Sequence, residues 1–154
     1  MTQTLSSTPA DTAPARPSPH HALKVLSVHH WTDQLSRFTL ERPEDVRSRS
    51  GEFVMIGLPG EVLLGKKPTG TLVLDALTGG ERLWLIGTGT GLAPWLSVAR
   101  DPDTYSRFGQ VIVCHTVRQV ADLAYRDFFT AGIHDDPLVG DEANAQLTYY
   151  PTVT

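Results

Sequence analysis

Hydrophobic and polar residues alternate along the first half of the chain in the manner of β-strands. Residues 23–31 and 35–41 lie on either side of a polar turn at 32–34, and Phe38 and Leu40 alternate with polar neighbours. This alternation has the period of a half-buried strand. The pattern therefore predicts two strands joined by a short turn.

Shorter apolar runs follow, separated by turns rich in Gly and Pro. These runs predict three strands, at 53–56, 62–64 and 71–74, of which the first is expected to be buried. The polar residues at 41–51 predict a loop. Residues 22–76 are thus expected to be all-β, with short strands as in a small barrel.

The pattern changes from residue 83 onward. Apolar runs predict strands at 83–86, 111–114 and 147–150, the last of them ended by Pro151. Residues at helical spacing predict two intervening helices, one with Leu92, Trp95, Leu96 and Ala99 on one side and one with Val120, Leu123, Ala124 and Phe128. Asp101-Pro102 ends the first helix, and Pro94 is tolerated in its first turn. The β-α-β-α-β order predicts half of a doubly wound domain.

Domain boundaries follow from these two patterns. Residues 22–78 are expected to form a partial β-barrel domain and residues 79–154 a partial α/β domain. Residues 1–21 are rich in Ser, Thr, Pro and Ala and contain few large apolar groups. Such a segment cannot bury enough surface to offset its chain entropy, so it is expected to be a disordered tail. It also lacks the apolar core of a secretory signal.

Composition narrows the function classes. The chain has 154 residues, 40% of them hydrophobic, and no apolar run long enough for a transmembrane helix. The net charge of −4 and a pI near 5.8 argue against nucleic-acid binding. A single cysteine, Cys114, cannot form an internal disulfide framework and favours a reducing compartment. A cytoplasmic protein without nucleic-acid or membrane partners is expected.

The segment Gly87-Thr88-Gly89-Thr90-Gly91 lies between a predicted strand and a predicted helix. Glycines at such a place let the backbone turn tightly and approach a phosphate, and the helix N-terminus supplies free N–H donors. The third glycine comes one residue too early for the usual dinucleotide fingerprint. The residues alone therefore leave two interpretations open, a nucleotide-binding loop or an ordinary turn between strand and helix.

The end of the second α/β strand bears on which nucleotide would bind. A protein that prefers NAD usually has an acidic residue there for the ribose 2′-OH, whereas an arginine accommodates a 2′-phosphate. Here the chain continues as His115-Thr116-Val117-Arg118, and the first carboxylate is Asp122. Arg118 either forks onto a phosphate or is a solvated surface residue.

The sequence gives less support to other kinds of site. Residues 60–67 have the spacing of a P-loop, but Lys67 stands where Ser or Thr would hold Mg²⁺, so a P-loop is rejected. The histidines are expected to be packing or hydrogen-bonded residues rather than metal ligands, and Cys114 a core residue. Trp84 and Trp95 are expected to face the core. No metal site is predicted.

The chain resembles the ferredoxin–NADP⁺ reductase family, and more narrowly the bacterial ferredoxin/flavodoxin–NADP⁺ reductases. The matching segments cover nearly everything after residue 21. They are Val25–Trp31, Gly51–Leu58, Lys67–Leu72, Gly87–Trp95, His115–Tyr125 and Tyr149–Thr154.

The resemblance implies a barrel that binds FAD and an α/β half that binds NADP(H), with a hydride passing between nicotinamide and flavin. The flavin then passes single electrons to a ferredoxin or a flavodoxin. It further implies that Thr88, Gly89, Thr90, Gly91 and Pro94 line the cofactor site. Val117 and Arg118 correspond to the family's contact with the 2′-phosphate.

Two departures from the family pattern stand out. The Arg-x-Tyr-Ser signature for the flavin is expected just after Leu58, but the chain continues directly into Val62-Leu63-Leu64, which matches a later barrel strand. The chain also stops at Thr154, where the family continues. Two hypotheses result: a flavin-dependent NADPH:ferredoxin (or flavodoxin) reductase with an internal deletion and a C-terminal truncation, or a catalytically inactive nucleotide-binding remnant.

Overall fold

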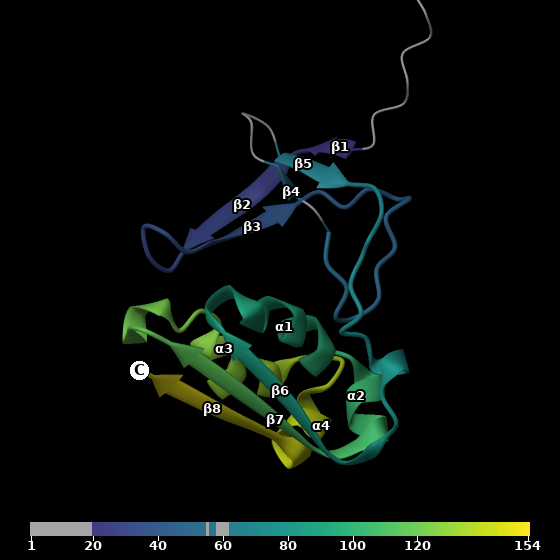
Figure 1. Ribbon diagram of the computed structural model, residues 1–154, viewed down its shortest axis with the longest axis vertical. Helices are drawn as coiled ribbons and strands as arrows, with labels where there is room; N and C mark the ends of the chain where they lie inside the picture. The colour runs from purple at the N-terminus through teal and green to yellow at the C-terminus, as the bar shows by residue number, and fades with distance from the viewer. Residues whose placement is uncertain (1–19, 55, 58–61) are drawn as a thin grey trace, which may run out of the picture.

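The computed structural model describes residues 20–54, 56–57 and 62–154. Figure 1 shows an antiparallel β half above an α/β half, with helix α1 (Ala93–Ala99) between the parallel sheet and the β half. This arrangement agrees with the two patterns read along the sequence. Most of residues 1–21, the predicted tail, lie outside the described residues.

The β half contains two small antiparallel sheets. One has the order β1-β5-β4 and consists of β1 (His20–Leu23), β5 (Val62–Gly65) and β4 (Ile56–Gly57). The other pairs β2 (Val25–His30) with β3 (Ser36–Leu40), so the predicted hairpin is confirmed. Every residue of β2 is exposed, because no second layer covers this two-stranded ribbon.

Several details of the β half differ from expectation. The first strand begins at His20, so His20 and His21 belong to β1 rather than to the tail, because they pair with Gly65 and Leu64. The predicted strand at 53–56 is reduced to a single bridge between Phe53 and Thr69 and the two-residue β4. Phe53 and Ile56 are 51% and 53% exposed, so the prediction that this strand is buried was wrong.

The predicted strand at 71–74 is absent. Leu74–Ala76 forms a 3₁₀ turn instead. The Arg107 guanidinium donates hydrogen bonds to the carbonyls of Leu74 and Leu77, which satisfies backbone acceptors that a strand ladder would otherwise use.

The α/β half contains a parallel sheet of order β6-β7-β8, as predicted. Its strands are β6 (Gly80–Thr88), β7 (Phe108–Val117) and β8 (Leu147–Val153). Besides α1, its helices are α2 (Pro102–Arg107), α3 (Arg126–Thr130) and α4 (Gly140–Gln146), with 3₁₀ turns at Gly89–Leu92, Val120–Asp122 and Gly132–Asp135. Asp101 caps α2 by accepting a hydrogen bond from the Asp103 amide.

The main hydrophobic core lies on one face of this sheet. Leu83, Leu85, Val111 and Val113 pack there with residues of the helices. Successive right-handed crossovers in the order β6-β7-β8 put the connecting helices on the same side. The alternate side chains therefore face away, and Trp84 is 56% exposed. The expectation that Trp84 faces the core was wrong, while Trp95 packs against the core and donates its indole N–H to the Ile86 carbonyl.

Two further expectations in this half fail. The second predicted helix is broken at Leu123–Tyr125, where Tyr125 adopts a left-handed φ of 60°, and only Arg126–Thr130 is α-helical. The third strand continues through Pro151, because β8 is an edge strand in the described sheet and an edge tolerates a residue without an N–H.

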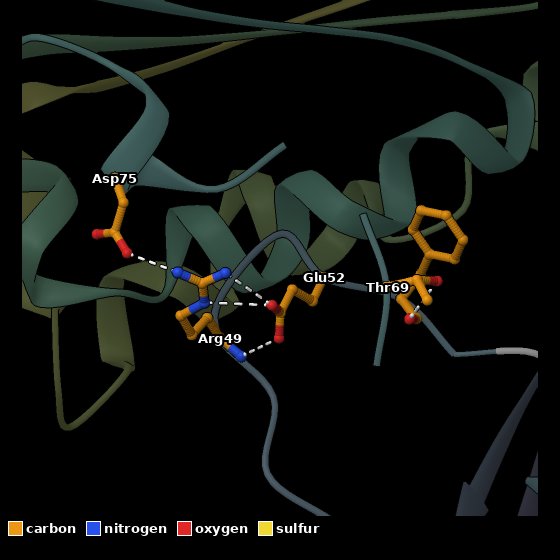
Figure 2. Close-up of polar contacts among 5 residues, drawn as sticks. Arg49, Glu52, Thr69 and Asp75 are labelled. Atoms are coloured by element: carbon orange, nitrogen blue, oxygen red, sulfur yellow. Dashed lines mark hydrogen bonds and ion pairs between the residues drawn. The ribbon is translucent and has the colours of Figure 1, made fainter. Parts of the chain in front are cut away.

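Polar contacts fix the loop before β4 within the β half and also join it to α1. Figure 2 shows Arg49 between two carboxylates, 3.0 Å from Glu52 and 2.8 Å from Asp75. The amide of Gly51 donates to the Ser97 hydroxyl of α1 at 2.9 Å. The loop before β4 is thereby attached to the helix that follows the glycine segment.

Candidate functional site

The glycine segment forms the connection from β6 to α1. Gly87 is buried and still in the strand, whereas Gly89, Thr90 and Gly91 are exposed. Gly89 has a φ of 51°, which suits glycine. A Cβ on Gly87 would lie 3.0 Å from the backbone of Gly91, so a larger residue there would press on the turn. The loop backbone is therefore accessible to a ligand.

The accessible part of the segment belongs to a 3₁₀ turn, Gly89–Leu92, that precedes α1. The sequence predicted a loop leading directly into a helix. The residues in reach of a ligand are thus those of the turn, and the α-helix itself begins one step later, at Ala93.

A cavity of about 570 Å³ opens beside this turn, between the two halves. Thr88, Gly89 and Thr90 line one side of it, and Val117 and Arg118 line another. The structure therefore brings together five of the seven predicted site residues. Gly91 and Pro94 do not line this cavity.

Residues at the carboxyl ends of the strands complete the α/β side of the cavity. They are Thr116 and Arg118 at the end of β7, Asp122 in the next turn, and Thr154 after β8. The Thr116 and Thr152 hydroxyls lie 2.7 Å apart and tie the two strand ends together. Ligands of open α/β sheets bind at this end of the strands. The exposed guanidinium of Arg118 gives the cavity a positive group suited to a phosphate.

The cavity also has a wall that sequence reasoning missed. Thr32, Gln34 and Leu35, from the turn between β2 and β3, line it together with the glycine turn. A polar turn in a predicted hairpin gave no sign that it would face a site in the other half. Only the packing of the two halves brings it there.

His115 lies in β7 just before the strand end and is fully buried. Its Nδ1 lies 3.1 Å from the Tyr149 hydroxyl, which agrees with the expected packing role. Its Nε2 has no hydrogen-bond partner among the described residues. Burial lowers the pKa of His115, and the neighbouring backbone of Gly89 partly opposes this shift. A neutral imidazole therefore lies beneath the glycine turn at neutral pH.

The described residues give no support for a metal site, a membrane-spanning helix or a P-loop. The described side chains form no cluster of three or more His, Cys, Asp or Glu. None of the described helices, the longest of which have seven residues, has the length and apolar content that a membrane span requires. Residues 62–65 of the rejected P-loop form β5, a regular strand that pairs with β1 and β4, while residues 60–61 lie outside the described part.

Comparison with known proteins gives a consistent set of relatives. The chain is 39% identical to the flavodoxin/ferredoxin–NADP reductase of Rhodobacter capsulatus, over 92% of this chain and 68% of that protein. It is 38% identical to the ferredoxin–NADP reductase of Pseudomonas aeruginosa, over 85% of this chain and 67% of that protein. No family model matches the chain.

Solved structures share the fold. A ferredoxin NADP⁺ reductase from Neisseria gonorrhoeae, with bound FAD and NADP, superposes with a TM-score of 0.76 at 23% identity, covering 89% of this chain and 69% of that one. A cytochrome P450 reductase from Amycolatopsis gives 0.63 at 22% identity, covering 86% and 51%.

The first alignment also bears on the expected deletion. It spans 186 positions, more than the 154 residues of this chain. The relative therefore has residues within the matched region that have no counterpart here.

Proposed function

The chain belongs to the ferredoxin/flavodoxin–NADP reductase family, and we propose that it binds NADP(H) at the glycine turn and serves the NADPH-dependent reduction of a ferredoxin or flavodoxin. The supporting observation is the cavity that joins Thr88–Thr90 with Arg118. A cytoplasmic location belongs to the same proposal.

The residues of the cavity can recognise separate parts of the dinucleotide. Arg118 lies where the 2′-phosphate contact is expected and can donate two parallel hydrogen bonds to phosphate oxygens. The exposed turn at Gly89 and Thr90 can accept the close approach of a diphosphate. Buried His115, whose pKa is lowered by burial, contributes no positive charge to phosphate binding at neutral pH. These residues bind and orient the nucleotide; they do not exchange protons with it.

The family's second cofactor, FAD, fits this chain less well. In the family it accepts a hydride from NADPH and releases single electrons. The chain has no tyrosine before Tyr105 to stack on a flavin ring. Three described arginines of the β half already have partners: Arg37 faces the Tyr125 ring, Arg42 donates to the Val46 carbonyl, and Arg49 pairs with Glu52 and Asp75. The proposal therefore rests on NADP(H), and no step is derived through the flavin.

The assignment of residues 22–78 to flavin binding and of 79–154 to NADP binding is also part of the proposal. The alternative of an inactive nucleotide-binding remnant has no specific support from the comparisons. It would apply if the purified chain bound NADP⁺ but did not reduce a ferredoxin or flavodoxin even with FAD added.

Isothermal titration of the purified chain with NADP⁺, NAD⁺ and 2′,5′-ADP tests the proposal. We expect NADP⁺ and 2′,5′-ADP to bind and NAD⁺ to bind more weakly. Arg118→Ala should weaken the two 2′-phosphorylated ligands about ten-fold or more, since hydrogen bonds to charged groups contribute about 1.5–3 kcal/mol.

Arg82→Ala provides the matched control. Arg82 is another exposed arginine, but it lies near the start of β6, away from the cavity, where it bonds to Gln110. Its loss should leave NADP⁺ binding unchanged. Equal affinity for NADP⁺ and NAD⁺, or no loss in Arg118→Ala, would contradict the proposal.

A further inference from the structure

The turn of the β2–β3 hairpin reaches the proposed nucleotide cavity from the β half. Thr32, Gln34 and Leu35 line the same 570 Å³ cavity as Arg118 and the glycine turn. A smaller cavity of about 80 Å³ is also lined by residues of both the hairpin and the glycine turn. The hairpin turn thus lies directly beside the loop.

A pair of aromatic rings holds this hairpin against the α/β half. Trp31, at the start of the hairpin turn, packs on Tyr125 with 4.7 Å between ring centroids and an interplanar angle of 58°. Arg37 of β3 lies 5.9 Å from the centre of the Tyr125 ring. His29 contacts Trp31 edge-on at 5.0 Å. One aromatic pair therefore connects β2 and β3 to the segment that follows Arg118.

The backbone transmits this attachment to the turn. The Trp31 amide donates to the Leu35 carbonyl at 2.9 Å, and the Leu35 amide donates to the Thr32 carbonyl at 3.3 Å. The Gln34 amide donates to the Thr32 hydroxyl. Once Trp31 is fixed on Tyr125, the position of Thr32–Leu35 is therefore fixed as well.

Gln34 is the residue of this turn that presents a side-chain amide to the cavity. It is exposed, and its side-chain amide has no partner among the described residues. An amide can donate to a phosphate oxygen and accept from a ribose hydroxyl. Asp122, across the same cavity, cannot donate to a phosphate when ionised.

We propose that Trp31 and Tyr125 form a clasp that positions Gln34 over the glycine turn, where Gln34 contacts the bound dinucleotide. This inference rests on the proposed function, because it assigns further residues to the same NADP(H) site. Trp31 and Tyr125 are positioning residues in this scheme, and Gln34 is the contact they position.

A double-mutant cycle on NADP⁺ affinity tests the scheme. We expect Gln34→Ala and Trp31→Ala each to weaken NADP⁺ binding about three-fold, because Trp31 acts through the hydrogen bond that Gln34 makes. The double variant of Trp31→Ala and Gln34→Ala should bind NADP⁺ no more weakly than Trp31→Ala alone, because Trp31→Ala already removes the contact of Gln34 with the nucleotide. Trp31→Phe, which keeps an aromatic ring, should restore most of the affinity.

Trp84→Ala is the matched control, because Trp84 is an exposed tryptophan of β6 that does not line this cavity. Tyr125→Gly separates positioning from folding. Glycine tolerates the left-handed backbone of residue 125, so this variant removes the ring without straining the fold. It should bind NADP⁺ as weakly as Trp31→Ala while retaining the far-UV circular dichroism of the unchanged chain.

The outcomes are distinguishable. Failure of the unchanged chain to bind NADP⁺ overturns the proposed function and the clasp with it. Binding by the unchanged chain, with Trp31→Ala and Tyr125→Gly both equal to Trp84→Ala, overturns the clasp alone. Additive losses from Trp31→Ala and Gln34→Ala overturn the claim that Trp31 positions Gln34.

Discussion

His115 shows how one buried side chain can make the stability of this protein depend on pH. Burial lowers the pKa of its imidazole in the folded chain, while the unfolded chain keeps a value near 6.5. Between these two values the unfolded state binds more protons than the folded state. The contribution of His115 to the free energy of unfolding is therefore fully present above about pH 6.5. It is lost as the pH falls from that value toward the lower pKa of the folded state.

We predict that the thermal midpoint of the chain decreases as the pH falls from 7.5 to 5.5, and that His115→Gln reduces the slope. Glutamine keeps a polar group near the Tyr149 hydroxyl but does not titrate. Differential scanning calorimetry at several pH values measures this. Equal slopes in the two proteins would show that His115 does not couple stability to pH.

Asp122 is the carboxylate that lines the proposed nucleotide cavity together with Arg118. An ionised carboxylate repels the phosphates of a dinucleotide, and salt screens this repulsion. We predict that Asp122→Asn tightens NADP⁺ binding on the order of three-fold at low ionic strength, and less at high ionic strength. Asp141→Asn, on α4 and outside the cavity, should have no effect in the same titration. Weaker binding by Asp122→Asn would mean that Asp122 helps to hold the ligand.

At the scale of elements, the docking of the loop before β4 on α1 depends on Gly51. Its φ is 88°, and an added Cβ would lie 1.8 Å from the Leu72 carbonyl oxygen. The left-handed conformation alone costs a non-glycine residue about 1–3 kcal/mol. The contact would in addition push the loop away from Ser97, whose hydroxyl accepts the Gly51 amide.

We therefore predict that Gly51→Ala destabilises the chain by at least about 1–3 kcal/mol in urea unfolding. Gly80→Ala is the control, because an added Cβ there meets nothing within 4 Å and the residue begins a strand. It should be neutral or stabilising by about 0.5–1 kcal/mol. Similar losses in both variants would argue against a specific role for Gly51.

The elements also show what could be predicted from the sequence. Apolar runs predicted β6 and β7, and helical spacing predicted α1, because each contributes apolar side chains to one core. The core-facing assignment of Trp84 failed, because an apolar run does not reveal that helices cover only one side of the sheet. The helix expected at 120–128 failed at Tyr125, where tertiary contacts with Trp31 and Arg37 accompany a left-handed backbone.

The candidate site likewise contains residues that the sequence predicted and residues that it did not. Local chemistry pointed to Thr88–Thr90 and Arg118, since a glycine turn and a strand end carry recognisable residues. Thr32, Gln34 and Leu35 could not be found, because their role depends on how a hairpin packs against a distant segment. Contacts between distant parts of a chain leave no local periodicity to read.

At the scale of the whole molecule, the two halves are unequally built. The large core cluster lies almost entirely in the α/β half, whereas the buried apolar residues of the β half are few, Val46, Val62, Leu64 and Val73 among them. The β2–β3 ribbon is exposed along all of β2, with Val25, Leu26, Val28 and Phe38 among its uncovered apolar side chains. A barrel that closed around a cofactor would cover such residues.

The difference between the two halves predicts that the chain binds NADP⁺ and FAD unequally. We expect the purified protein to bind NADP⁺ but to carry no stoichiometric flavin, because the β half lacks both a closed sheet among its described residues and a tyrosine to stack on the ring. The visible absorbance spectrum, taken before and after addition of FAD and desalting, measures this. The Neisseria gonorrhoeae reductase, whose structure holds FAD, purified in parallel, controls for loss of flavin during preparation. A flavin spectrum that survives desalting at one equivalent per chain would show that the open β half holds FAD without the expected tyrosine, and that this chain has its own way of binding the flavin.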